Sequence, residues 1–213
     1  LIAVESGVCR VVSSERPLVQ YYANAIAHFF ERREQREGVS APADARGLRP
    51  GLAPTITADR AVILVHGLAR TWRSMTRLAT RLKAAGYTVY NWDYPSRKFG
   101  ILELVGALEA YARVVAKSGG HVDFVTHSMG GLLVRGALAR GTFPSAGRVV
   151  MLAPPNQGSV IASKAKEYEW ARGYFGRALV DLSRDQKGGV VDSLGAPSCP
   201  FGIVAGTRSF HPL

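Results

Sequence analysis

The residues best suited to chemistry in this 213-residue chain are Ser128 and its small neighbours. The stretch T-H-S-M-G-G, at 126–131, follows a strand-like run at 122–125 and precedes a helical pattern. A serine at such a strand-to-helix turn is held with its hydroxyl exposed, which suits a nucleophile, and the turn needs small residues two positions away on either side. Gly130 meets this need on one side, whereas Thr126 stands where the common G-x-S-x-G pattern has its first glycine. The stretch therefore predicts a nucleophilic serine in a variant of that pattern.

A second stretch supplies what a nucleophilic serine needs beside it. Attack on a carbonyl creates an oxyanion, which must be stabilised by hydrogen-bond donors. Met129 can offer its backbone N–H from the start of the helix, and the turn after an apolar run at 62–65 can offer that of Leu68. Gly67 lets this turn approach closely, because glycine has no Cβ. We therefore expect Leu68 and Met129 to form an oxyanion hole.

The elements that position these residues alternate regularly from residue 61 onwards. A continuous apolar run predicts a strand at 61–65, and strand-like runs predict others at 87–92, 121–125, 148–152 and 201–205. Helical periodicity predicts helices at 74–85, 101–115 and 129–140. This alternation indicates an α/β fold with a mostly parallel central sheet and helices on both faces. Reactive groups gather at the carboxyl ends of the strands in such sheets, and Ser128, Gly67 and Asp93 all follow predicted strand ends.

Two segments differ from this alternation. Residues 1–60 are expected to form an N-terminal helical extension and loop, with an amphipathic helix over 14–37. Residues 61–213 are then the core domain. Within it, 154–197 carries four aromatic residues and several glycines, and it is expected to be either a lid or acyl-binding wall above the sheet, or a set of ordinary packing helices.

Four stretches, in order, resemble those of serine hydrolases with the α/β-hydrolase fold, close to bacterial lipases and esterases. They are H-G-L at 66–68, D-Y-P-S-R at 93–97, T-H-S-M-G-G at 126–131 and P-P-N-Q-G-S at 154–159. The resemblance covers about residues 60–210. It implies Ser128 as the nucleophile and Leu68 and Met129 as oxyanion donors, while Asp93 is structural. The residues that it implies shape the site are His66, Gly67, His127 and Gly130.

The acid and the histidine that would complete a catalytic triad must follow Ser128 in chain order. The only later histidine is His211. In one interpretation, 201–205 is the seventh strand of the fold, and the chain stops before the acid loop, the eighth strand and the histidine loop. In the other, Val190-Val191-Asp192 ends a short seventh strand, 201–205 is the eighth, and Asp192 and His211 are the acid and the base. The first is favoured because the 201–205 region resembles the seventh strand of related lipases, and because chain ends are rarely well ordered.

The chemistry and the resemblance together predict an enzyme that hydrolyses carboxylic esters, of lipids or other acyl compounds, through an acyl-Ser128 intermediate. Neither a cofactor nor a metal is expected. One alternative is acyl transfer, or hydrolysis of an amide or thioester, at the same site. The other is a catalytically incomplete module of the same fold that binds lipid or membrane.

The formal net charge of +11 favours acidic partners such as an anionic membrane surface. Arg73, Arg77 and Arg81 recur every four residues in a helical segment, with apolar residues on its opposite side. They form either a solvated outer face or a basic stripe that holds the protein against anionic lipid. No nucleic-acid-binding motif accompanies the charge, so we expect no nucleic-acid partner.

The remaining composition gives only broad limits. No apolar run approaches the roughly 20 residues that a membrane span needs, so we expect a soluble chain, cytoplasmic or extracytoplasmic, with or without association with a membrane surface. Cys9 and Cys199 lack the spacing of metal ligands. They are either two thiols or one disulfide.

Overall fold

The computed structural model describes residues 61–117, 120–141, 146–185 and 188–206, and the backbone of two strands at 2–5 and 8–11. The helix expected at 14–37 lies outside these residues, as does His211. The structural statements below concern the described part of the chain.

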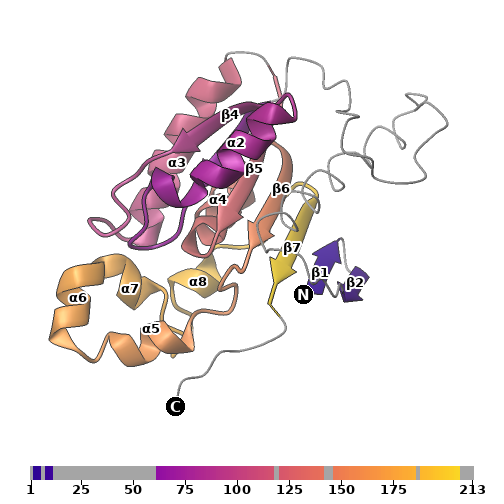
Figure 1. Ribbon diagram of the computed structural model, residues 1–213. Coiled ribbons are helices and arrows are strands. Elements are labelled where there is room, and N and C mark those ends of the chain that lie inside the picture. The colour runs from indigo at the N-terminus through magenta and orange to yellow at the C-terminus, as the bar shows by residue number, and fades with distance from the viewer. Residues whose placement is uncertain are drawn as a thin grey trace.

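A seven-stranded sheet, in the order β2-β1-β7-β6-β5-β3-β4, runs through the described residues (Figure 1). Five of its strands pair in parallel, namely β3 (Ala61–Val65), β4 (Thr88–Trp92), β5 (Val122–His127), β6 (Ala146–Leu152) and β7 (Phe201–Ala205). The predicted mostly parallel sheet is thus confirmed. A hairpin of β1 (Ile2–Glu5) and β2 (Val8–Val11) adds two antiparallel strands beside β7, which the sequence patterns do not predict.

Helices cover both faces of this sheet, as predicted. α2 (Thr76–Ala84), which follows the 3-10 turn η1 (Trp72–Met75), packs on one face. α3 (Ile101–Lys117) and α4 (Met129–Ala139) pack on the other. None of the helices in the described residues combines the length and apolar character that crossing a membrane requires.

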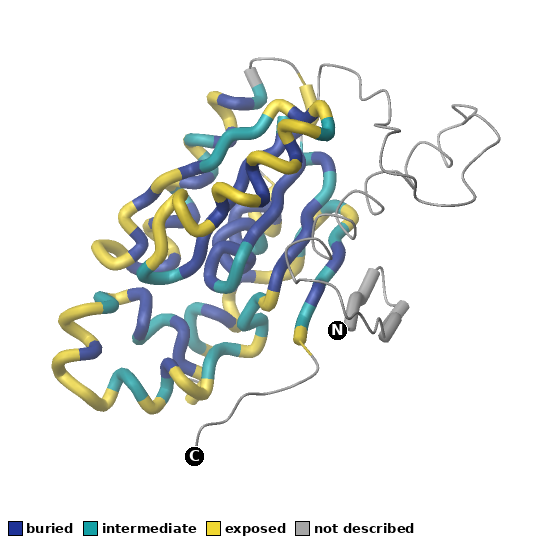
Figure 2. The backbone as a smooth tube through the Cα atoms, viewed as in Figure 1, coloured by how far each residue is buried: buried dark blue, intermediate teal, exposed yellow. Residues whose placement is uncertain are grey.

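β3 illustrates why a strand in the middle of this sheet is apolar throughout. Ile63 and Val65 belong to the cluster beneath α3 and α4, whereas Val62 and Leu64 belong to the cluster beneath α2. All four side chains are completely buried, and the strands form the buried centre of the molecule (Figure 2). Because side chains alternate between the faces of a strand, a strand covered on both faces favours apolar residues at successive positions. Each of these side chains contributes about 1.5–3 kcal/mol by leaving water.

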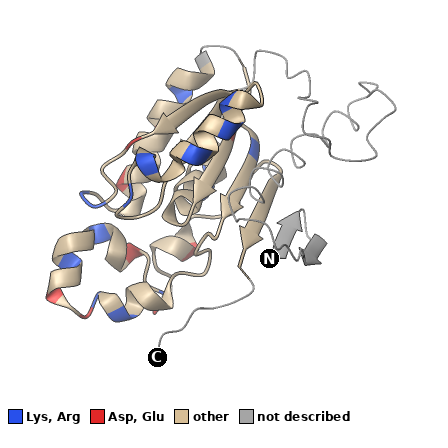
Figure 3. Cartoon of the chain, viewed as in Figure 1, with Lys and Arg blue, Asp and Glu red and all other residues tan. Residues whose placement is uncertain are grey.

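The outer side of η1 and α2 is basic (Figure 3). Arg73, Arg77 and Arg81 are exposed, while Leu78 and Leu82 on the opposite side are buried against the sheet. The predicted division of this segment into a basic outer side and an apolar inner side is therefore confirmed. Contact of these arginines with lipid stays a prediction.

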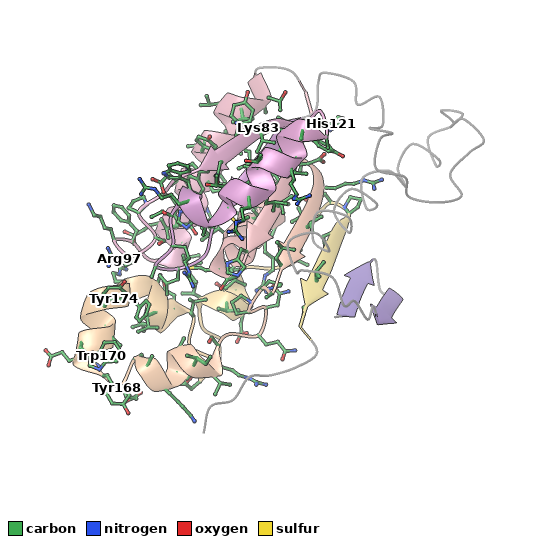
Figure 4. All side chains as sticks on the ribbon, in the orientation of Figure 1. Lys83, Arg97, His121, Tyr168, Trp170 and Tyr174 are labelled. Atoms are coloured by element: carbon green, nitrogen blue, oxygen red, sulfur yellow. The ribbon has the colours of Figure 1, made fainter. Side chains whose placement is uncertain are left out.

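Four short helices fill the interval between β6 and β7 and lie beyond the carboxyl ends of the strands (Figure 1), namely α5 (Val160–Ala165), α6 (Glu169–Phe175), α7 (Arg177–Asp181) and α8 (Val190–Ser193). Ala171 and Leu179 join the buried cluster of α3 and α4, so these helices pack as part of the domain. Tyr168 at the N-cap of α6, and Trp170 and Tyr174 within this helix, are large side chains that stay exposed (Figure 4). A lid role for this segment stays a prediction.

One of the two interpretations of the C-terminal strands is wrong in its strand assignment. Val190, Val191 and Asp192 form the helix α8, not the end of a strand. Gly189 is the N-cap of this helix, and the Asp192 carboxylate accepts a hydrogen bond from the Gly188 amide at 3.1 Å. β7 pairs directly and in parallel with β6, so no strand stands between them.

The start of α3 is capped from a distant part of the chain. Glu103 reaches back to accept a hydrogen bond from the Gly100 amide at 2.8 Å, which is one half of a capping box. Gly100 has no side chain to supply the other half. The Asp181 carboxylate caps the helix in another way, because it accepts a hydrogen bond from the Ile101 amide, the first of α3, at 2.7 Å. This contact fastens α7 to the amino end of α3.

We expect Asp181→Ala to lower the free energy of unfolding by about 1 kcal/mol, because the Ile101 amide loses its acceptor and the positive end of α3 loses a carboxylate. Asp181→Asn keeps an acceptor oxygen in the same place and is expected to cost less. Urea denaturation of both variants measures the difference. Equal stability of wild type and Asp181→Ala would contradict the assigned capping role.

Candidate active site

Ser128 occupies the turn between β5 and α4, where the sequence predicts it. Its backbone has φ 53° and ψ −124°, a conformation that residues other than glycine rarely adopt. Its amide donates to the Leu152 carbonyl at 2.9 Å, and its carbonyl accepts from the Gly131 amide at 2.9 Å. These bonds from both sides hold a backbone whose strain costs on the order of 1–3 kcal/mol. The serine is thereby fixed at the end of the strand, half-buried, with its side chain outside regular structure.

Two glycines let α4 approach the sheet closely enough to make this turn. A Cβ on Gly130 would lie 2.4 Å from the Val65 carbonyl oxygen. A Cβ on Gly131 would lie 3.3 Å from the hydroxyl oxygen of Thr126. Thr126, the residue that departs from the G-x-S-x-G pattern, thus fits because Gly131 leaves room for it.

The turn that follows β3 meets the Ser128 turn at Gly67. A Cβ on Gly67 would lie 3.1 Å from the Ser128 Cβ and 3.2 Å from Nδ1 of His127. Among the described residues, neither the Leu68 amide nor the Met129 amide has a hydrogen-bond acceptor. The structure therefore brings together the predicted nucleophile and two turns that each hold a backbone donor without an acceptor.

The turn at 66–70 is tied to the D-Y-P-S-R loop that follows β4. The Tyr94 hydroxyl donates to the His66 carbonyl at 2.6 Å, and the Ala69 amide donates to the Ser96 hydroxyl oxygen at 3.1 Å. Asp93 accepts from the Trp72 amide at 3.2 Å. The structural role expected for Asp93 agrees with this bond, while sequence reasoning misses the contacts of Tyr94 and Ser96.

His66 and His127, predicted to shape the site, flank the meeting point of the two turns. The His66 ring is completely buried, stacks on Tyr94 with centroids 4.1 Å apart, and donates from Nδ1 to the Gly67 carbonyl at 2.9 Å. Burial lowers the pKa of His66 below its usual value, outweighing that hydrogen bond and the Asp93 carboxylate, which raise it.

The pKa of His127 is also lowered, first by burial, then by the positive charge of Arg70, and last by His66 when that ring is protonated. Both rings are therefore neutral at neutral pH.

The predicted triad partners are not brought to Ser128 by any contact that the structure describes. Asp192 binds the Gly188 amide, and its charge faces the Arg135 guanidinium. His211 lies outside the described residues, and its role as a base stays a prediction. No three His, Cys, Asp or Glu side chains come together as metal ligands within the described chain.

Arg135 links two other segments to α4, and sequence reasoning misses it. Its guanidinium donates to the Asn156 carbonyl at 3.0 Å, to the Asn156 side-chain oxygen at 3.2 Å and to the Val191 carbonyl. The turn after β6 and the helix α8 are thus joined through one side chain. The sequence of α4 could have drawn attention to Arg135, because it is the one charged residue in that helix.

Comparisons with known proteins agree with this architecture. A model of the alpha/beta hydrolase family matches residues 62–205. A lipase of Bacillus licheniformis, BlEst2 in its mature form, is 22% identical with a TM-score of 0.54, over 64% of this chain and 58% of the lipase. Phospholipase PlaB from Legionella pneumophila is 22% identical with a TM-score of 0.52, over 63% of this chain and 33% of the phospholipase.

The chain thus spans about a third of one structure and less than three fifths of the other, and the likeness is one of fold. A search of curated proteins gives no match.

Gly130→Ala is expected to lower the free energy of unfolding by roughly 3 kcal/mol, because the new methyl group meets backbone oxygens that cannot move aside. Gly106→Ala in α3 is the matched control, since its Cβ meets nothing within 4 Å. It should leave stability unchanged or raise it by up to about 1 kcal/mol. Chemical denaturation followed by circular dichroism measures both. If the two variants behave alike, the close contact of α4 with β3 is not what holds the turn.

Proposed function

Because the chain belongs to the alpha/beta hydrolase family, we propose that it is a serine hydrolase that cleaves carboxylic esters of lipids or other acyl compounds through an acyl-Ser128 intermediate. The observation that carries this proposal is the meeting of the Ser128 turn with the Gly67 turn, beside which the amides of Leu68 and Met129 have no acceptor among the described residues. The names of two structural neighbours, a lipase and a phospholipase, support acyl esters as the substrate class.

In the proposed reaction, the Ser128 oxygen bonds to the carbonyl carbon of the ester and its proton passes to a general base. His211 is a candidate for this base only in the less favoured interpretation of the C-terminal strands. The carbonyl oxygen becomes an oxyanion between the Leu68 and Met129 amides, and each such donor contributes on the order of 3 kcal/mol to the transition state.

Collapse of the intermediate breaks the bond to the alcohol, which leaves with the proton. Water then attacks the acyl-serine in the same way, releases the carboxylic acid and restores the Ser128 hydroxyl.

We expect a fluorophosphonate probe to label Ser128 in the full-length protein, and Ser128→Ala to abolish the labelling. Hydrolysis of short-chain nitrophenyl esters should fall by roughly 10⁴-fold or more in this variant, because the covalent route is lost. Ser74→Ala, which changes an exposed serine on η1, is the control and should keep both labelling and activity. A wild type as inert as Ser128→Ala would refute the proposal.

The exposed arginines Arg73, Arg77 and Arg81 support an anionic membrane surface as the place where the protein meets its lipid substrate. They stand on one outer side of η1 and α2, so a flat anionic surface can contact all three. A basic residue near such a surface contributes about 1 kcal/mol, and this attraction weakens with salt.

Replacing Arg73, Arg77 and Arg81 together with glutamine is expected to reduce co-sedimentation with vesicles that contain phosphatidylglycerol. The matched control replaces three exposed basic residues on other segments, Arg113, Lys164 and Arg184, which changes the net charge equally. This control should still sediment with the vesicles. Equal losses in the two triple variants would mean that net charge alone drives the association.

A further inference from the structure

We propose that Tyr94 and Ser96 are positioning residues, which fix the peptide between Gly67 and Leu68 so that its N–H faces the reacting carbonyl at Ser128. The inference rests on the proposed function, because it concerns an oxyanion donor. It goes beyond that function by naming the two side chains that set the donor's direction. Neither side chain is proposed to touch the substrate.

The peptide groups on both sides of this donor are each held by a buried hydroxyl. The Tyr94 hydroxyl donates to the carbonyl of His66, in the peptide before the Gly67–Leu68 group. The Ser96 hydroxyl oxygen accepts from the amide of Ala69, in the peptide after it. Tyr94 is only 5% exposed and Ser96 only 3%, so water is poorly placed to replace either bond.

The carbonyl of the central peptide is held as well. The Gly67 carbonyl accepts from Nδ1 of His66 at 2.9 Å and from the Arg70 amide at 3.2 Å. The N–H and C=O of a planar trans peptide point in opposite directions, and the described residues contain no cis peptide. The Leu68 N–H therefore points away from these donors, and no group among the described residues accepts a hydrogen bond from it.

The turn needs to be held because its backbone is unfavourable. Ala69 has φ 55°, in the left-handed region that an alanine adopts only at a cost in free energy. The bond from its amide to Ser96 opposes relaxation of this residue. Without that bond, rotation at Ala69 would carry the neighbouring Leu68 peptide with it.

The Tyr94 ring is held separately from its hydroxyl, which makes the hydroxyl testable alone. The ring stacks on His66 with centroids 4.1 Å apart and on Trp92 with centroids 4.4 Å apart. Burial raises the pKa of Tyr94, so the phenol keeps its proton and stays a donor. Tyr94→Phe therefore removes the bond to the turn while keeping the stack.

The test measures kcat and KM of the full-length protein on a nitrophenyl ester and on the matching thionoester, in which sulfur replaces the carbonyl oxygen. An oxyanion hole is built for oxygen, so the preference for the oxygen ester reports its geometry. For Tyr94→Phe and for Ser96→Ala we expect kcat on the oxygen ester to fall roughly 10- to 100-fold with little change in KM, and the preference for oxygen to fall with it. Loss of folded protein would instead lower both rates equally.

Two further variants keep this test decisive. Tyr111→Phe removes a hydroxyl from the same aromatic stack, with centroids of Tyr111 and Trp92 5.6 Å apart, and should retain wild-type kcat and preference. Ser96→Cys fills nearly the same volume with a poor acceptor. It replaces Ser96→Ala in the test if Ser96→Ala folds badly, and the same loss of kcat and of preference for oxygen is expected.

The result that overturns the inference is a Tyr94→Phe or Ser96→Cys protein with wild-type kcat and wild-type preference, or with equal losses on both esters. In that case Ser128→Ala still separates from wild type, and the proposed function stands. If wild type and Ser128→Ala are equally inert, the proposed function fails and the inference fails with it.

Discussion

The first turn of α4 lies directly on the carbonyl oxygens that end β3, and no side chain fits between the two backbones. Gly130 occupies the point of contact, where a Cβ would lie 2.4 Å from the Val65 oxygen and 2.8 Å from the His66 oxygen. Because the helix begins so close to the neighbouring strand, the chain must turn sharply after β5, and Ser128 takes up that turn with a positive φ. The same closeness carries Gly67 to the serine. The meeting of the two turns is thus a consequence of backbone packing.

A second layer of residues, outside this contact, gives the turn after β3 its shape. Tyr111 of α3, Trp92, Tyr94 and His66 form a continuous stack of rings from the helix layer to the candidate site. The stack is apolar where it faces the core. At its other end, the Tyr94 hydroxyl and Nδ1 of His66 are the polar groups that bind the turn. Rigid rings lose little conformational entropy on burial, so a stack of them places a hydroxyl accurately.

Much of the fold can be predicted from the sequence, because strands buried on both faces and amphipathic helices each have a recognisable pattern of apolar residues. The runs ending at Val65 and at Leu152 could be recognised from the absence of polar residues alone. The short segment Val190–Asp192 could not, since three residues show no periodicity, and Gly189 together with the Asp192 carboxylate starts a helix there. The hairpin of β1 and β2 leaves no clear pattern of its own, because its place depends on the edge of β7.

The candidate site was predictable where chemistry depends on neighbours in sequence, and not where it depends on distant partners. Ser128 and Gly67 follow strand ends, so their positions come from local patterns. The bonds of Tyr94 to His66 and of Asp181 to Ile101 join residues that are 28 and 80 positions apart. Hydroxyls and carboxylates are common on any surface, so only the fold reveals which of them face a backbone amide or carbonyl.

The three hydrogen bonds of Arg135 have a mechanical consequence for the segment between β6 and β7. Asn156 stands at the beginning of that segment and Val191 near its end, and both are bound by the same guanidinium. Both ends of the segment are therefore bound to the same side chain of α4. The span between the two ends is also held, because Ala171 and Leu179 pack in the core and Asp181 binds the Ile101 amide. Moving the whole segment away from α4 would break these contacts and the Arg135 bonds at both ends at once.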